Sequence, residues 1–406
     1  MNPWRGLGAL PKEVWYLCLA ILVNRAGTMV LPFLTLYLTV DQRWSAGTAG
    51  LALTIYGIAA IIVAPLAGRL SDRLGSMLII KLSLFISGLI LFVFPFVTSV
   101  FGILSITAVW AFVNESFRPP SMALIGRLTG PAQRKMAFAL SRLAVNLGMS
   151  IGPVIGGFLA MKSFRTLFYV DGTTAILAGT LIAFMPWRIQ EAMPDVVATD
   201  SQSTTPPAVG YGSVLRDRRF VYFLIAMLPI EMVFFQTLAA MPLFVVRDLQ
   251  ISEAAFGMLL AINTVMIIFT EVPLNTAMSN WSHRHTIALG ALLVGVGFGG
   301  LAISGDASAI AATVVVWTVG EMILLPASSA YVSDIAPPAQ AGAYMGLYTM
   351  GFSLAFAIGP WLGVEVLERL GPVAVWLGTL GCGCLTALLI WRQRTEKEAG
   401  AVGSRQ

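Results

Sequence analysis

Long apolar stretches, interrupted by charges and turn residues, follow one another along the whole chain. Each stretch reaches or exceeds the roughly 20 residues that a helix needs to cross the hydrocarbon core of a membrane. Strands are excluded because an open strand in lipid would leave backbone groups unpaired, and because a barrel strand needs only about 9–11 residues. The pattern predicts an all-α polytopic membrane protein with twelve transmembrane helices, at residues 14–39, 46–70, 77–97, 101–126, 134–161, 165–186, 219–245, 253–278, 284–304, 307–332, 340–368 and 372–391.

The composition excludes a water-soluble globular protein. Of the 406 residues, 57% are hydrophobic and only 11% are charged, and the mean hydropathy is +0.82, whereas a soluble domain is about a quarter charged. The three cysteines lie in apolar stretches, which excludes a disulfide scaffold. The first span carries Arg25 at its centre and is too long for the core of a cleavable signal peptide. The net charge of +5 does not indicate nucleic acid, and we expect no such partner.

Lysine and arginine predict the orientation, because basic loops tend to stay on the cytoplasmic side. If the amino terminus is inside, the cytoplasmic loops and span ends hold most of the 25 basic residues. The opposite side holds Arg43, Lys162, Arg165, Arg247 and Arg369. We therefore expect both termini in the cytoplasm and the chain in the plasma (inner) membrane.

The chain resembles itself at an offset of 207 residues. Three blocks meet their counterparts without a gap: Trp110 and Trp317, Pro131-Ala132-Gln133 and Pro338-Ala339-Gln340, Ile151-Gly152-Pro153 and Ile358-Gly359-Pro360. Chance explains one pair of small apolar residues, but not these blocks in one register. The repeat predicts two six-helix halves of equal orientation, at residues 1–186 and 219–406, joined by a cytoplasmic linker at 187–218. Parallel repeats of this kind are typical of secondary transporters.

Two motifs resemble the major facilitator superfamily. Gly68-Arg69-Leu70-Ser71-Asp72-Arg73-Leu74-Gly75, between the second and third spans, is similar to the loop signature of that family, although Ser76 and Met77 stand where two basic residues are usual. In the fifth span, residues 148–157 are similar to a motif of the proton-driven drug exporters of the family. The arginine and Gln-Gly pair that these exporters tend to carry early in the fourth span are absent. The resemblance implies a twelve-helix secondary transporter.

The motif between the second and third spans predicts a gate, formed by Gly68, Asp72, Arg73 and Gly75. Asp72 lies where the second span meets the loop, so its carboxylate can accept hydrogen bonds from a helix amino terminus. The family resemblance implies that this helix is the eleventh, near Gln340. Such a contact would latch the halves on the inner side. A solvated turn that only supplies cytoplasmic charge is the alternative.

The motif in the fifth span predicts close helix packing. Gly148, Gly152 and Gly156 allow another helix to approach, and Pro153 bends the span. Generic membrane packing would use the same residues.

The sequence predicts no enzyme, no cofactor and no metal site. Residues 148–152 fit the G-x-S-x-G hydrolase pattern but lack the preceding strand and the histidine partner. His283 and His285 are too few and too exposed to anchor a metal. The glycines of residues 295–300 fit a dinucleotide-binding fingerprint but lie inside a predicted membrane helix. No phosphate-cradling lysine motif is present, so ATP is not the expected source of energy.

Ionisable residues inside the spans are the candidates for function, because each costs roughly 2.5–3.5 kcal/mol at a helix centre. Seven are strong candidates: Arg25, Glu115, Arg118 and Arg142 in the first half, and Glu231, Glu271 and Glu321 in the second. At the offset of 207 residues, Asn24 meets Glu231 and Asn114 meets Glu321, which indicates a shared central cavity. A charge pair that only stiffens the bundle is the alternative, above all for Arg142 and Glu271 near the cytoplasmic ends.

The sequence therefore predicts alternating access around a site at the middle of the membrane. We assign proton coupling to Glu231 and Glu321. Glu115 is an additional candidate that ranks below them, because Arg118, three residues later, can neutralise it locally. The substrate-binding candidates are Asn24, Arg25, Asn114, Arg118 and Gln236. The expected function is proton-coupled efflux of a small molecule by a functional monomer, with protons and the lipid bilayer as its other partners. A carrier of an anionic or zwitterionic metabolite, bound by Arg25 and Arg118, is the alternative.

Overall fold

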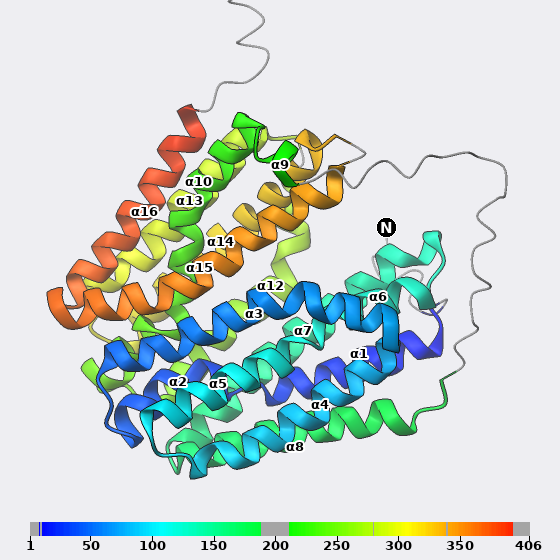
Figure 1. Ribbon diagram of the computed structural model, residues 1–406. Coiled ribbons are helices and arrows are strands. Elements are labelled where there is room, and N and C mark those ends of the chain that lie inside the picture. The colour runs from blue at the N-terminus through cyan, green and yellow to red at the C-terminus, as the bar shows by residue number, and fades with distance from the viewer. Residues whose placement is uncertain (1–7, 9, 188–210, 279, 338–339, 393–406) are drawn as a thin grey trace, which may run out of the picture.

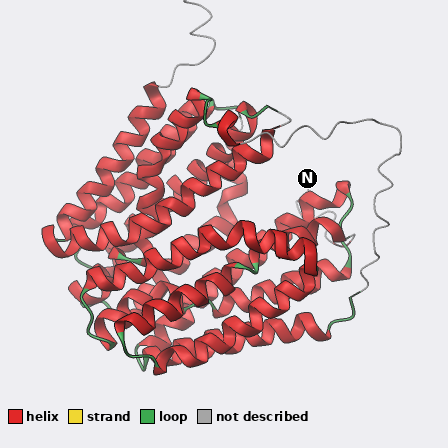
Figure 2. Ribbon diagram, viewed as in Figure 1, coloured by secondary structure: helices red, strands yellow, loops and turns green. Residues whose placement is uncertain are grey.

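The computed structural model describes residues 8, 10–187, 211–278, 280–337 and 340–392. These residues form helices joined by short loops, and no strand occurs among them (Figure 2). Twelve helical segments are long and apolar enough to cross a membrane. The predicted fold class is therefore confirmed. Most of the predicted linker at 187–218 lies outside the described residues.

The helices of the first half, which we call the first bundle, are α1 (Lys12–Gly27), α2 (Val30–Leu36), α3 (Ala46–Leu74), α4 (Ser76–Val93), α5 (Val100–Glu115), α6 (Arg118–Leu128), α7 (Pro131–Ala160) and α8 (Phe164–Phe184). Those that follow are α9 (Tyr211–Val214), α10 (Arg218–Phe234), α11 (Ala240–Pro242), α12 (Glu253–Ala277), α13 (His283–Gly300), α14 (Ala307–Ile335), α15 (Ala341–Leu370) and α16 (Pro372–Arg392). Helices α10–α16 form the second bundle, which lies beside the first (Figure 1).

The two bundles repeat one backbone. Helix α3 begins at Ala46 and α12 begins at Glu253, 207 residues later, and the other long helices keep this offset within a few residues. Even the unusual backbone recurs, because Arg43 and Gln250 both have a φ of 57°. Short π-helical turns precede both residues, at Tyr37–Asp41 and Leu243–Asp248. The sequence repeat is therefore a structural repeat.

Three predicted spans are not continuous helices, which corrects the sequence analysis. The span at 14–39 divides into α1 and α2, and the span at 101–126 divides into α5 and α6. In the span at 101–126, Pro119 and Pro120 have no backbone N–H to continue the helical hydrogen bonds. The span at 219–245 passes from α10 into a 3₁₀ turn at Phe235–Leu238 and then into α11. The first and seventh spans are thus interrupted at matching positions of the repeat.

A second correction concerns the segment between the second and third spans. Residues 71–74, expected in a loop after the span at 46–70, are helical and extend α3 to Leu74. Only Gly75 separates α3 from α4. Its φ of 86° suits glycine, because a side chain strains that conformation.

The bundles touch at one end and diverge toward the other (Figure 1). We call the end where α8 ends and α10 begins the linker end, and the opposite end, with the α15–α16 turn, the distal end. Helices α3 and α15 approach closely at Gly57, where an added Cβ would lie 2.9 Å from the Cα of Ala357. Eleven residues further toward the linker end, Gly68 and Gly346 have no neighbouring atom within 4 Å of such a Cβ. The contact between α3 and α15 is therefore tight only toward the distal end.

The substitution Gly57→Leu should separate the bundles at the distal end, because the new side chain would collide with the backbone of α15. We expect a longer mean distance between spin labels placed at the distal ends of α3 and α15. Gly378→Leu on α16, where a Cβ meets no atom within 4 Å, is the matched control. An unchanged distance distribution in the Gly57 variant would contradict the proposed contact.

Candidate functional site

A hydrogen-bond network joins α3, α4 and α5 in the first bundle. Asn114 Nδ2 donates to the Tyr56 hydroxyl at 2.7 Å, and this hydroxyl donates to Glu115 Oε1 at 2.8 Å. Trp110 Nε1 donates to Ser87 Oγ at 3.1 Å, and Ser87 Oγ lies 3.5 Å from Asn114 Oδ1. The polar side chains of this network are thus bonded to one another inside an apolar bundle. Glu115 is held by Tyr56.

The break in the first span is held by an acid on α8. The backbone N–H groups of Met29 and Val30 both donate to Asp171 Oδ2, at 3.2 and 3.1 Å. Without this carboxylate, the amino terminus of α2 would leave N–H groups unpaired inside the bundle. Arg25 lies in the last turn of α1 and is close enough to Asp171 and Tyr56 to act on both electrostatically. The break therefore fixes the position of Arg25.

The glycines of the fifth-span motif pack against this same break. Gly148, Gly152 and Gly156 are spaced four residues apart on α7, so they share one helix face. An added Cβ at Gly152 would lie 2.8 Å from the carbonyl oxygen of Thr28, and one at Gly156 would lie 2.8 Å from Met29 Cβ. Glycine is needed along this face because the backbones of α7 and the first span approach so closely.

The second bundle repeats the geometry of the network with different chemistry. Asn263 Nδ2 on α12 donates to Glu321 Oε2 on α14 at 2.7 Å and to Thr318 Oγ1 at 3.2 Å. At the 207-residue offset, Asn263 corresponds to Tyr56 and Glu321 to Asn114. The same pair of positions is therefore bonded in both bundles, but only the second bundle has an acid in the pair.

Glu231 is the most enclosed acid among the sequence candidates. It lies on α10 with 1% of its surface exposed, and neither carboxylate oxygen has a hydrogen-bond partner among the described residues. Gly351 of α15 packs against it, since an added Cβ would lie 3.2 Å from Oε2, and Tyr348 is close enough to interact electrostatically. Its counterpart in the first bundle, Asn24, is also buried.

The remaining substrate-binding candidates are Gln236, Arg118 and Asn114. Gln236 is buried, and its Nε2 donates to the carbonyl oxygens of Met232 and Gly359 at 3.1 and 2.8 Å. It thus bridges the seventh span to α15. Arg118 begins α6 and is exposed. Asn114 belongs to the network with Tyr56.

The gate residues lie at the linker end of α3. Gly68 and Arg73 are on the helix and Gly75 ends it. The side chain of Asp72 and residues 338–339 before α15 lie outside the described part of the structure. The latch between Asp72 and the amino terminus of α15 therefore stays a prediction.

Arg142 and Glu271, functional candidates for which a stiffening charge pair was the alternative, form an ion pair between the bundles. The Arg142 guanidinium on α7 donates to Glu271 Oε1 on α12. The two residues are 129 positions apart in the chain. No spacing rule could have paired them.

Three polar residues of the sites described above were not among the sequence candidates: Asp171, Tyr56 and Asn263. Asp171 could have been found, because any acid within a membrane span is a functional candidate by default. Tyr56 and Asn263 could have been found from the repeat, since they are polar residues at matching positions.

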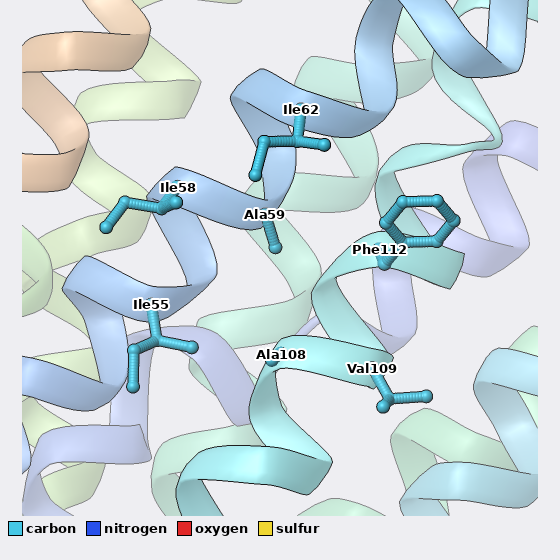
Figure 3. A pocket seen from close by; sticks show the side chains of 7 residues that line it. All are labelled: Ile55, Ile58, Ala59, Ile62, Ala108, Val109 and Phe112. Carbon is cyan, nitrogen blue, oxygen red and sulfur yellow. The ribbon is translucent and has the colours of Figure 1, made fainter.

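A groove on the outside of the first bundle contains none of the polar residues described above. It lies between α3 and α5 and is lined by Ile55, Ile58, Ala59, Ile62, Ala108, Val109 and Phe112 (Figure 3). These side chains offer no polar group. In the described ranges no cluster of three or more histidine, cysteine or acidic side chains could hold a metal ion.

Two parallel six-helix repeats, with matching helix breaks and with ionisable residues between them, define the class of secondary transporters. The family model of the Major Facilitator Superfamily matches residues 17–248 and 232–406. The chain belongs to this superfamily, and it is a transporter rather than an enzyme.

Curated relatives cover most of the chain. The "Uncharacterized MFS-type transporter YqjV" of Bacillus subtilis (strain 168) is 24% identical over 375 residues, which are 91% of this chain and 89% of that protein. The "Multidrug resistance protein MdtH" of Cronobacter sakazakii (strain ATCC BAA-894) is 25% identical over 385 residues, or 91% and 90% of the two chains.

Solved structures share the fold. The crystal structure of the nucleoside transporter NupG matches with a TM-score of 0.76 at 14% identity, over 94% of this chain and 99% of that one. The crystal structure of a D-xylose-proton symporter matches with a TM-score of 0.74 at 17% identity, over 95% and 98%. At these identities the likeness is one of fold.

Removal of the Asp171 cap should destabilise the protein. We expect Asp171→Ala to lower the free energy of unfolding by about 2 kcal/mol, because two N–H groups lose a charged acceptor in a buried setting. Asp171→Asn, which keeps one acceptor oxygen, should lose less. Thermal unfolding in detergent measures both effects.

Asp306→Ala is the matched control. Asp306 caps α14 through the N–H groups of Ser308 and Ala309, but it is exposed, so water can replace its carboxylate. Its removal should cost less than that of Asp171. Equal losses of stability would show that the break does not depend on Asp171.

Proposed function

We propose that this protein exports a small molecule in exchange for protons, by alternating access between the two bundles. The observation that carries the proposal is the position of Glu231, buried against α15 with both carboxylate oxygens unbonded among the described residues. An ionised carboxylate in such surroundings would carry its charge without compensation, at a large cost in free energy. Glu231 therefore suits a residue that carries a proton in this conformation and releases it in another.

Glu321 is the second proton-coupling residue of the proposal. It lies at the position of the repeat where the first bundle has neutral Asn114. Its partner Asn263 donates one hydrogen bond, which an ionised or a protonated carboxyl group can accept. Glu115 stays the additional candidate and ranks below Glu231, because its carboxylate already has a hydrogen-bond donor in Tyr56.

The orientation follows from the positions of the basic residues. We place the linker end in the cytoplasm, since Arg69 and Arg73 of α3, Arg127 of α6 and Arg134 of α7 are near that end. In the conformer described above, α3 and α15 are then in close contact toward the outside and not toward the cytoplasm. In that orientation it would receive substrate from the cytoplasm.

One further feature supports export. Relatives over nine-tenths of the chain include proteins named "Multidrug resistance protein MdtH". We also propose that the protein acts as a monomer in the plasma (inner) membrane.

A carrier of an anionic or zwitterionic metabolite is the second candidate, and one observation favours it. Arg25 Nε is buried and has no hydrogen-bond partner within the described residues. A guanidinium that faces a substrate carboxylate or phosphate can donate two hydrogen bonds in parallel. Asp171 nearby offers the alternative that Arg25 serves the protein itself.

Substitution of the acids tests the proton coupling. Glu231→Gln or Glu321→Gln should abolish accumulation driven by a pH gradient but leave substrate exchange within a few-fold of wild type, because a neutral amide permits alternation without proton release. Proteoliposomes with and without a pH gradient, tested against a chemically diverse panel of labelled compounds, measure both quantities.

Glu368→Gln is the control for the acid variants, since Glu368 is exposed and bonds Arg247 at the distal end. It should accumulate substrate normally. If both Glu231→Gln and Glu321→Gln also retain gradient-driven accumulation, facilitated diffusion becomes the better assignment.

Arg25 distinguishes the two candidate functions. If substrate is anionic, Arg25→Lys should weaken binding about tenfold or more, because lysine cannot offer the paired donors of a guanidinium. If Arg25 serves Asp171, Arg25→Lys should leave affinity unchanged and lower thermal stability instead. Binding is measured with purified protein and the compounds that the transport panel identifies. Normal transport, affinity and stability in Arg25→Ala would exclude both roles.

A further inference from the structure

The ion pair between Arg142 and Glu271 joins the two bundles. The other ion pairs among the described residues, such as Arg247 with Glu368 and His283 with Asp334, lie within the second bundle. Arg142 is on α7 and Glu271 is on α12. Any movement of one bundle against the other must therefore keep, stretch or break this pair.

The pair extends the contact between α7 and α12 toward the linker end. Near the distal end these helices touch through backbone, since a Cβ at Gly257 would collide with the carbonyl oxygen of Pro153. Arg142 lies eleven residues before Pro153, and Glu271 lies fourteen residues after Gly257, which is roughly 16–21 Å along a helix. At the comparable level between α3 and α15, the glycines of the two helices have no neighbours.

The pair is electrostatically connected to Glu321. Glu271 and Arg142 are the charged groups that act on the Glu321 carboxylate, and Asn263 is its hydrogen-bond donor. Helix α13, which also packs against α14, places Gly290, Leu293 and Val294 against Gly320, the residue before Glu321. The Arg142 guanidinium thus acts on two carboxyl groups, those of Glu271 and Glu321. The net charge of these three groups is zero when one of the two carboxyl groups carries a proton.

The two side chains of the ion pair differ in their exposure to solvent. The Arg142 side chain is 61% exposed, whereas the Glu271 side chain is only 11% exposed. A carboxylate so desolvated depends on its cation, while the cation can turn away into solvent. Arg142 is therefore the movable member of the cluster.

We infer that Arg142 is a positioning residue that couples the proton on Glu321 to the contact between the bundles. When Glu321 accepts a proton from water, it loses its negative charge and no longer attracts Arg142. The guanidinium then pairs with Glu271 alone and holds α7 to α12. When Glu321 returns the proton to water, its negative charge competes for Arg142 and the contact loosens. The inference rests on the proposed role of Glu321 as a proton carrier.

Three variants test the inference: Arg142→Gln, Glu271→Gln, and the charge-swapped double variant Arg142→Glu with Glu271→Arg. The two neutral variants should reduce gradient-driven accumulation about tenfold while substrate exchange stays within a few-fold, because coupling is lost but alternation is not. The double variant should recover accumulation at least in part, since it restores opposite charges across the bundles. Rescue by charge reversal would not occur if the two residues merely filled space.

A conformational measurement gives a second readout. Spin labels at exposed Ala139 on α7 and Thr276 on α12 report the separation of the helices near the pair. In wild type, alkaline solution should broaden the distance distribution and acid should narrow it. Arg142→Gln should give a broad distribution at both pH values, and Glu321→Gln a narrow one at both. Arg247→Gln, which breaks an ion pair within the second bundle, should behave as wild type.

The outcomes separate the inference from the proposed function. Normal accumulation in both Arg142→Gln and Glu271→Gln, with Glu321→Gln impaired, would overturn the inference and leave the proposed function intact. Normal accumulation in Glu321→Gln itself would count against the role of Glu321 on which both depend. Failure of the charge-swapped variant to recover accumulation, while it still exchanges substrate, would also overturn the inference.

Discussion

An interrupted helix inside a membrane protein must find hydrogen bonds for its free backbone groups, because lipid offers none. In the first span this need is met by one carboxylate, Asp171, which accepts from both Met29 and Val30. The glycine face of α7 can then approach the break directly, and Arg25 is fixed at the end of α1. The position of Arg25, the only arginine in the first span, therefore depends on an acid of another helix, 142 residues after Met29.

The repeat conserves packing more than chemistry. Both bundles keep the same helix positions and the same pair of bonded polar positions between their second and fourth spans. The pair is Tyr56 with Asn114 in the first bundle and Asn263 with Glu321 in the second. Since the geometry is shared, the difference in charge between the bundles comes from side chains alone. A duplicated scaffold can thus hold an asymmetric set of ionisable groups.

The sequence predicts the spans, the repeat and most of the ionisable residues, because each is written in local hydropathy or in a fixed offset. It does not predict the break in the first span, since the cap that permits the break comes from another helix. The proline pair after Glu115 could have signalled the break in the fourth span, which the sequence analysis gave as continuous. The ion pair between Arg142 and Glu271 could not be predicted, because it depends on how one bundle is docked against the other.

The two lines of contact between the bundles differ in kind, and this difference bears on how they can move. Helices α3 and α15 meet through small residues at Gly57 and Ala357, where the contact depends on fit. The acid that α15 places against α3, Glu365 at Gly47, is paired with Arg369 of its own helix and not with a described residue of the other bundle. Helices α7 and α12 meet through backbone near the distal end and through a charge pair nearer the linker end. Packing contacts respond to shape alone, whereas a charge pair also responds to the protonation of a neighbouring acid. In the proposed mechanism, the α7–α12 contact is therefore where a proton biases the arrangement of the bundles, and the packing of α3 against α15 follows that change.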